Sequence, residues 1–216
     1  MKHSSPVPVA FLSMLMLVAS RAHAGGNPSA ANSAVPTIVR LVGASGGVPD
    51  VAAGQFTVVA RDLANNPVDG IPITLDLSNC PDLALCPDQM DPSAVTSCTA
   101  KTIQKITNLQ GQVTFTVLGS SNGSGHASSL AGSARIFGGR GLTWIGAPSV
   151  ASFDLDGSGG VGAGDLSAWL ADFGSGQPYA RSDFDGSGDI GAADLSQWLA
   201  VYGAGGSVQS CAASCP

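Results

Sequence analysis

Eight of the 15 acidic residues of this chain lie between residues 154 and 194, and all 15 are aspartates. An Asp-x-Asp-Gly-Ser-Gly sequence begins at Asp154 and again at Asp183, and a further aspartate follows each, at Asp165 and Asp194. The constant offset of 29 residues indicates two copies of one structural unit. Because carboxylates that lie close together repel one another, this pattern suits a bound cation.

The spacing within each copy resembles the EF-hand calcium loop, in which oxygens at positions 1, 3, 5, 7 and 12 surround one ion. Calcium prefers about six to eight oxygen ligands, and a glycine at position 6 allows the sharp turn that the loop requires. Gly159 and Gly188 stand there. The predicted ligands of two calcium ions are Asp154, Asp156, Ser158, Gly160 and Asp165 in the first loop, and Asp183, Asp185, Ser187, Asp189 and Asp194 in the second. Gly160 and Asp189 are expected to bind through their backbone carbonyls.

A short amphipathic helix is expected after each loop, because apolar residues recur there at i, i+3, i+4 and i+7. These residues are Leu166, Trp169, Leu170 and Phe173, then Leu195, Trp198, Leu199 and Tyr202. Gly174 and Gly203 are expected to end the two helices. The apolar stripes are interpreted as the shared core of a two-helix unit, and an exposed binding face is the alternative. No helix is predicted before either loop, where Pro, Gly and Ser are frequent.

A calcium loop followed by one helix, present twice over residues 152–203, resembles a type I dockerin. The resemblance implies two calcium ions and docking to a cohesin-like domain, chiefly in the assembly of enzymes that degrade plant polysaccharides. Dockerins often carry a Ser-Thr-like pair at loop positions 10 and 11, whereas this chain has Ala163-Gly164 and Ala192-Ala193. The predicted helices also lack Lys and Arg, so the usual recognition residues are absent and the partner stays open.

Upstream of the repeats, short apolar runs alternate with turn residues, which is typical of antiparallel β-structure. About seven strands at this spacing favour a β-sandwich over residues 36–147. A long insertion that contains Pro and Cys is expected from Cys80 to about Cys98. The expected strands include Thr37–Val42, Phe56–Arg61, Ile71–Leu77, Val113–Leu118, Ala134–Phe137 and Leu142–Ile145.

Two segments of this region resemble bacterial Ig-like domains of the invasin/intimin type. One is a strand from Phe56, the turn Asp-Leu-Ala-Asn-Asn-Pro-Val-Asp-Gly and a second strand; the other is Thr-Asn-Leu-Gln-Gly-Gln-Val-Thr-Phe from Thr107. The resemblance implies an Ig-like sandwich that acts as a spacer or adhesive module outside cells. The predicted fold class is therefore mainly β with a small α C-terminal domain: an antiparallel Ig-like β-sandwich followed by a two-repeat, dockerin-like calcium module.

The first 24 residues have the pattern of a secretory signal peptide, with Lys2, an apolar run over 7–19 and small residues before the expected cleavage after Ala24. The apolar run is too short to span a bilayer, and no transmembrane segment is predicted in the mature chain. The protein is expected to be secreted or on the cell surface. The expected organisation is a signal peptide (1–24), a flexible leader (25–35), the sandwich (36–147), a linker (148–151), the calcium module (152–203) and a Cys-containing tail (204–216).

Cleavage leaves seven basic residues against 15 aspartates, a net charge of −8. Such a chain repels nucleic acid, whose binding depends on cationic contacts to phosphate, and suits cations instead. Its five cysteines are Cys80, Cys86, Cys98, Cys211 and Cys215. Export permits disulfides, and the odd number leaves one thiol over. Either Cys80 or Cys86 is expected to pair with Cys98, and Cys211 with Cys215. A zinc site is disfavoured because no Cys-x-x-Cys is present.

Residues that could support catalysis are scarce, since His126 is the only histidine after cleavage and the chain has no Glu. The sequence therefore predicts a non-catalytic, calcium-binding interaction module with a cohesin-like or other extracellular partner. The alternative is a component of an extracellular polysaccharide-degrading system, through glycan binding or association with glycoside hydrolases. A sandwich with only Phe56, Phe115, Phe137 and Trp144 as aromatic residues disfavours a glycan-binding platform. A cell-wall anchor through the odd cysteine is a third possibility.

Overall fold

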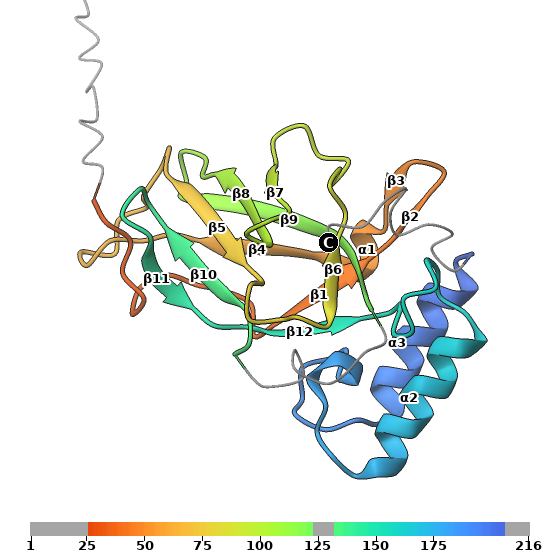
Figure 1. The fold of residues 1–216 in the computed structure, drawn as a ribbon. Helices are drawn as coiled ribbons and strands as arrows, with labels where there is room; N and C mark the ends of the chain where they lie inside the picture. The colour runs from red at the N-terminus through yellow and green to blue at the C-terminus, as the bar shows by residue number, and fades with distance from the viewer. Residues whose placement is uncertain (1–25, 123–131, 206–216) are drawn as a thin grey trace, which may run out of the picture.

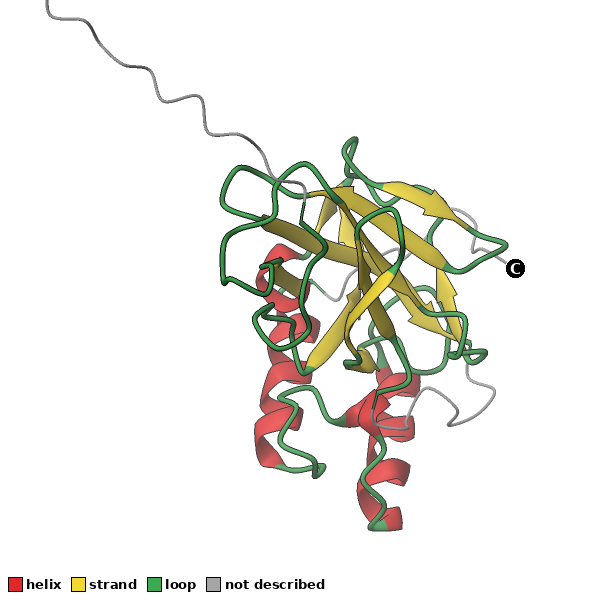
Figure 2. Cartoon of the chain, turned by 90° about the vertical axis from the view of Figure 1, so that its left-hand side faces the viewer, coloured by secondary structure: helices red, strands yellow, loops and turns green. Residues whose placement is uncertain are grey.

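The computed structural model describes residues 26–122 and 132–205 of the chain. Two five-stranded β-sheets and a small two-stranded sheet form one unit, here called the β-unit, and two longer helices lie at one end of it (Figures 1 and 2). The chain is mainly β with few helices, as predicted. The strands are β1 (Ile38–Val42), β2 (Ala44–Ser45), β3 (Val48–Pro49), β4 (Gln55–Val59), β5 (Pro72–Asp76), β6 (Leu83–Leu85), β7 (Val95–Ser97), β8 (Thr102–Ile106), β9 (Gln112–Ser121), β10 (Arg135–Gly138), β11 (Thr143–Gly146) and β12 (Ser149–Ser152); the helices are α1 (Val51–Gly54), η2 (Ala180–Ser182), α2 (Ala163–Ser175) and α3 (Ala192–Gly203).

The first sheet has the strand order β12-β1-β9-β4, and β6 pairs with the far end of β9. Strand β1 is parallel to both of its neighbours: Leu41 lies opposite Val117 of β9 and Ser152 of β12. The prediction of a wholly antiparallel sandwich is therefore wrong for this sheet. A parallel pair needs a long crossover, and β1 and β12 meet this condition because they lie at opposite ends of the β-unit in sequence.

The second sheet, β11-β10-β5-β8-β7, is antiparallel in every pairing. Strand β8 was not among the strands expected from the sequence, and β6 and β7 fall inside the expected insertion. The two sheets face each other across one apolar core, to which Leu41 and Phe115 contribute from the first sheet and Leu75 and Ile103 from the second. These four side chains are at most 2% exposed.

The expected linker at residues 148–151 is instead mostly strand β12, which pairs with β1 along its length. The chain leaves this strand directly into the first aspartate loop, without a spacer. Ala151 of β12 and Phe153, just after the strand, belong to a second apolar core. This core also includes Leu118 of β9 and Trp169 and Trp198 of the helices. The calcium module predicted from the sequence is thus packed against the end of the first sheet.

The described part of the expected flexible leader, residues 26–35, packs on the β-unit. The Ser29 amide donates to the Arg61 carbonyl at 2.7 Å, and Ala34 forms a β-bridge with Val59. The Asn32 side chain also donates to the Asp62 carbonyl, at 2.8 Å. These residues lie along the edge of the first sheet next to β4. They form hydrogen bonds with backbone groups of that edge that would otherwise face water.

Cys86 and Cys98 are both in disulfides, whereas Cys80 is a buried free thiol. The alternative that pairs Cys80 with Cys98 is therefore wrong. The predicted Cys211–Cys215 bridge and the signal peptide lie outside the described residues. Among the residues that are described, none of the helices combines the length and apolarity that a bilayer span requires.

Candidate metal centre

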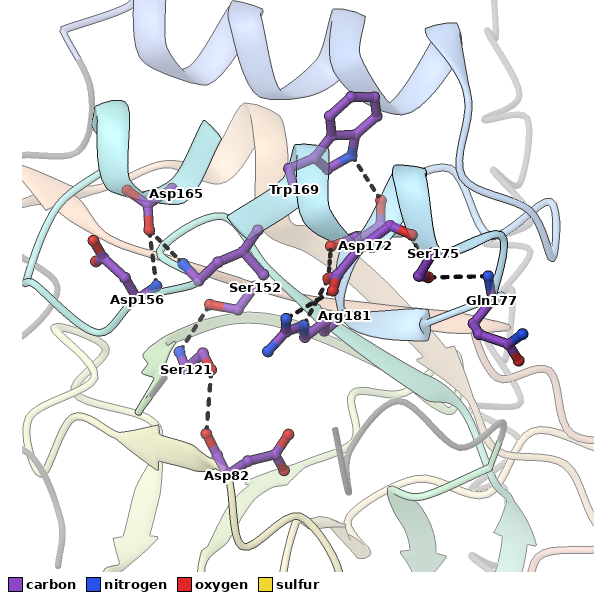
Figure 3. Close-up of polar contacts among 12 residues, drawn as sticks. Asp82, Ser121, Ser152, Asp156, Asp165, Trp169, Asp172, Ser175, Gln177 and Arg181 are labelled. Atoms are coloured by element: carbon purple, nitrogen blue, oxygen red, sulfur yellow. Dashed lines mark hydrogen bonds and ion pairs between the residues drawn. The ribbon is translucent and has the colours of Figure 1, made fainter. Parts of the chain in front are cut away.

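The first aspartate loop brings Asp154, Asp156 and Asp165 together, and one carboxylate oxygen of each lies within 4.8 Å of the others. Asp165 is fully buried and accepts three backbone N–H groups. Its Oδ1 accepts those of Leu155 at 2.6 Å and Asp156 at 3.0 Å (Figure 3), and its Oδ2 accepts that of Gly162 at 2.7 Å. The closing aspartate of the loop therefore also holds the loop in shape.

Asp154 has the carboxylate whose surroundings best fit a metal ligand. Its Oδ2 accepts the Gly159 amide at 2.9 Å, but its Oδ1 is buried and has no hydrogen-bond partner. Burial, and then the neighbouring carboxylate of Asp165, raise the pKa of Asp154 to about 6. A buried carboxylate oxygen without a partner is costly, and a cation in the loop would satisfy it.

The second loop repeats this arrangement with Asp183, Asp185 and Asp194, again within 4.8 Å. Asp183 accepts Gly186 at 2.8 Å on Oδ1 and Gly188 at 2.9 Å on Oδ2. Asp194 accepts the Asp185 amide at 3.0 Å, as Asp165 accepts that of Asp156. Burial raises the pKa of Asp183 and that of Asp165. Ionisation of these buried carboxylates is therefore unfavourable in the metal-free protein, and a bound cation would stabilise the ionised form.

The middle aspartate of each triad is less buried and has a different environment. The Ser187 hydroxyl and amide lower the pKa of Asp185. For Asp156, burial raises the pKa, but hydrogen bonds with Ser158, and after them those with Asp165 and Asp154, hold the pKa below its usual value. Each loop thus offers at least one carboxylate that is ionised throughout the neutral range and can attract a cation.

Helices α2 and α3 place the closing aspartates. Asp165 and Asp194 stand in the first turn of their helices, and their Oδ2 atoms accept the amides of Gly162 and Gly191 just before the helix. A negative charge is favourable at this end because the helix dipole and the unpaired N–H groups point toward it. The same carboxylate therefore caps a helix and faces the loop centre.

The structure brings six of the ten predicted ligands into the two triads, namely the six aspartates of positions 1, 3 and 12. The other four predicted ligands are not part of the triads: Ser158, Gly160, Ser187 and Asp189. The Ser187 hydroxyl donates to Asp189 Oδ1 at 2.7 Å, and the Ser158 amide donates to Asp156. A set of hard carboxylate oxygens fits a hard divalent cation, so the two triads could each hold a metal ion.

A buried ion pair between α2 and η2 was not predicted from the sequence. Arg181 donates to both carboxylate oxygens of Asp172, at 2.7 and 2.8 Å, and the Ser182 hydroxyl donates to the same carboxylate at 2.6 Å (Figure 3). A difference between the two repeats could have indicated it, because the charged Asp172 has the apolar Val201 as its counterpart 29 residues later. The pair fixes the segment that leads into the second loop.

Two stretches, 43–47 and 119–123, match the Gly-x-Ser-x-Gly pattern of serine hydrolases. In hydrolases this pattern forms a sharp turn between a strand and a helix. Here Ser45 lies in the short β2–β3 hairpin, and Ser121 lies in β9 with its hydroxyl directed to the Asp82 carbonyl, at 3.4 Å. Neither stretch has the setting that the pattern requires.

No protein-family model, no curated protein and no solved structure matches this chain.

Proposed function

We propose that this chain is a secreted, non-catalytic protein whose C-terminal module binds two calcium ions and docks onto an extracellular protein partner. In this proposal the β-unit is an Ig-like spacer or display domain, and residues 152–203 are a dockerin-like module. The observation that carries the proposal is the buried, unpaired Oδ1 of Asp154 at the centre of a carboxylate triad that a second triad repeats.

Calcium is proposed because the loops offer oxygen ligands only, in a spacing that suits its larger coordination number. Asp154, Asp156 and Asp165 would hold one ion, and Asp183, Asp185 and Asp194 the other, with Ser158, Gly160, Ser187 and Asp189 completing the shells. The bound ions would neutralise carboxylates that burial places under strain, and so stabilise the loops and the helix starts.

The docking surface in this proposal is an apolar stripe on the two helices, made of Leu170, Phe173, Leu199 and Tyr202. Each of these side chains is about half exposed, at 49 to 53%. Phe173 stacks on the buried Trp169 and Tyr202 on the buried Trp198, with ring centroids 5.4 and 5.2 Å apart. The two tryptophans belong to the second apolar core, as predicted, whereas the core interpretation is wrong for the four outer residues, which are half exposed. In this proposal the outer residues present preorganised apolar surface to a partner.

Isothermal titration of the purified protein with calcium tests the metal-binding half of the proposal. We expect two ions per chain in the wild type and one in each of the variants Asp154→Asn and Asp183→Asn. Asp88→Asn removes the same charge from the β-unit outside the triads and is expected to leave the stoichiometry at two. A wild-type titration without heat at millimolar calcium contradicts the proposal.

Capture from the extracellular fraction of the source cells tests the docking half. A partner is expected in calcium and not in chelator, and Phe173→Ser with Tyr202→Ser is expected to weaken it by about 30-fold or more, as for central apolar interface residues. Leu63→Ser is the control, because Leu63 is 86% exposed on a turn of the β-unit. Equal capture by both variants would remove the helices from the interface.

Association with polysaccharide is a second candidate, and one observation favours it. Trp144 of edge strand β11 is 52% exposed and lies opposite Phe137 of β10, so the second sheet carries a small aromatic surface. Retention of the protein on insoluble polysaccharide, lost in Trp144→Ala, is the expected result for glycan binding. Retention that Trp144→Ala leaves unchanged argues against this surface.

A further inference from the structure

The first sheet supplies a positive charge to the second aspartate loop. Arg40 of β1 donates a hydrogen bond from Nε to the carbonyl of Phe184, the residue between Asp183 and Asp185. Its Nη1 donates to the Ala53 carbonyl at 3.4 Å. Arg40 and Asp185 also line the same cavity, of about 230 Å³, between β1 and α1. The guanidinium is therefore held next to the loop from two sides.

The charge of Arg40 acts on the same three carboxylates that would hold the second ion. Burial lowers the pKa of Arg40, and the carboxylates of Asp185, Asp183 and Asp194 raise it. An arginine stays protonated in proteins, so a full positive charge persists beside this triad.

The first loop meets a different part of the sheet. A Cβ at Gly157 would lie 2.6 Å from the Ser121 carbonyl and 3.1 Å from Asn122, so this loop rests on two uncharged residues at the end of β9. The corresponding Gly186 of the second loop lies against Ile38, which is two residues before Arg40 on β1. The two copies of the repeat thus contact the sheet at equivalent glycines but in unequal electrostatic surroundings.

We propose that Arg40 makes the two calcium sites unequal, because its positive charge stands in for a cation at the second loop of the metal-free protein and opposes calcium there. The inference rests on the proposed calcium binding. Two consequences follow from it. The second site binds calcium more weakly than the first, and the second loop stays on the sheet when calcium is removed.

Calcium titration of single-site proteins tests this inference. Asp154→Asn leaves the second site and Asp183→Asn leaves the first, and we expect the second site to be the weaker. Adding Arg40→Gln to Asp154→Asn is expected to tighten the second site by roughly tenfold, since a full charge beside a divalent ion is removed. Adding it to Asp183→Asn is expected to leave the first site unchanged.

Two matched variants separate charge from fold. Arg40→Lys keeps the charge and is expected to retain the weak second site. This variant keeps the inference testable if Arg40→Gln proves unstable. Arg61→Gln removes the same charge beyond the far end of β4, where Arg61 donates to the Asn65 carbonyl, and is expected to change neither site. The role of Arg40 is overturned if Arg40→Gln leaves the calcium affinity of the second site unchanged or weaker. It is also overturned if Arg40→Lys increases that affinity as much as Arg40→Gln does. Neither result affects the proposed calcium binding itself. A wild type that binds no calcium overturns the proposed function as well.

Discussion

At the scale of single residues, the repeat is a duplication whose copies have diverged where they meet the rest of the chain. The six triad aspartates are the same in both copies, whereas Asp172 has Val201 as its counterpart. Asp172 is 2% and Arg181 7% exposed, so their ion pair is almost out of contact with water. In the other half of the module, Val201 packs in the second apolar core instead.

The buried pair predicts an asymmetric response to mutation. Asp172→Asn leaves the Arg181 charge uncompensated and is expected to cost about 3–5 kcal/mol of unfolding free energy. Asp172→Val combined with Arg181→Met removes both charges and is expected to recover most of that loss. Urea unfolding measures both, with Asp91→Asn as the control, since Asp91 is more exposed in its ion pair with Lys105. A double variant no more stable than Asp172→Asn contradicts this account.

The free thiol of Cys80 is expected to be unreactive in the folded protein. Burial raises its pKa to about 11, and Cys80 is completely buried. At pH 8 only about one molecule in a thousand therefore carries the reactive thiolate. Labelling by iodoacetamide, located on the Cys80 peptide by mass spectrometry, is expected to be negligible at pH 8, to rise as the pH approaches 11, and to be rapid in denaturant at pH 8. Rapid labelling of the native protein at pH 8 would show that the site opens.

At the scale of elements, the helices differ from the prediction at one end. Gly174 does not end α2, which continues to Ser175 and is capped by Gly176 in the left-handed conformation, with φ of 66°. Gly203 is the last residue of α3, as predicted. The difference has a local cause: only a residue with positive φ lets the Gly176 amide return to the Phe173 carbonyl, and Gly176 takes that conformation.

Alanine substitutions at these two glycines are expected to have opposite signs. Gly174→Ala places a Cβ in open space on a helix and is expected to stabilise the protein by about 0.5–1 kcal/mol. Gly176→Ala forces an alanine to a positive φ and is expected to destabilise it by about 1 kcal/mol or more. Thermal melts of the two variants in calcium provide the comparison. If Gly174 were the true cap, the signs would be reversed.

At the scale of the whole molecule, the β-unit and the module share a core. Leu118 of β9 is fully buried in the cluster that contains Phe153, Trp169 and Trp198, and strand β12 runs into the first loop without a linker. The loops themselves rest on β9 and β1. Helices and sheets should therefore not unfold independently.

Calorimetry is expected to show one cooperative unfolding transition for the protein in the presence of calcium. Leu118→Ala removes packing from the shared core and is expected to destabilise that single transition by about 2–5 kcal/mol. Leu109→Ala, at a side chain that is 70% exposed, is expected to change it little. Two separate transitions, only one of them shifted by Leu118→Ala, would show that the module folds on its own.

The sequence by itself determined the features that depend on neighbours close along the chain. The spacing of aspartates and glycines defined both loops, the period of Leu and Trp defined both helices, and period-2 patterns located most strands, since each reflects local backbone geometry and the burial of one face. Only the tertiary structure decided which distant strands pair. It placed β1 parallel between β9 and β12, turned the expected linker into β12, left Cys80 unpaired and set Arg40 beside the second loop. A local pattern predicts that a face is buried but not which element covers it. Strands that pair across more than 100 residues, such as β1 and β12, do not affect the spacing of apolar residues in each other's sequence.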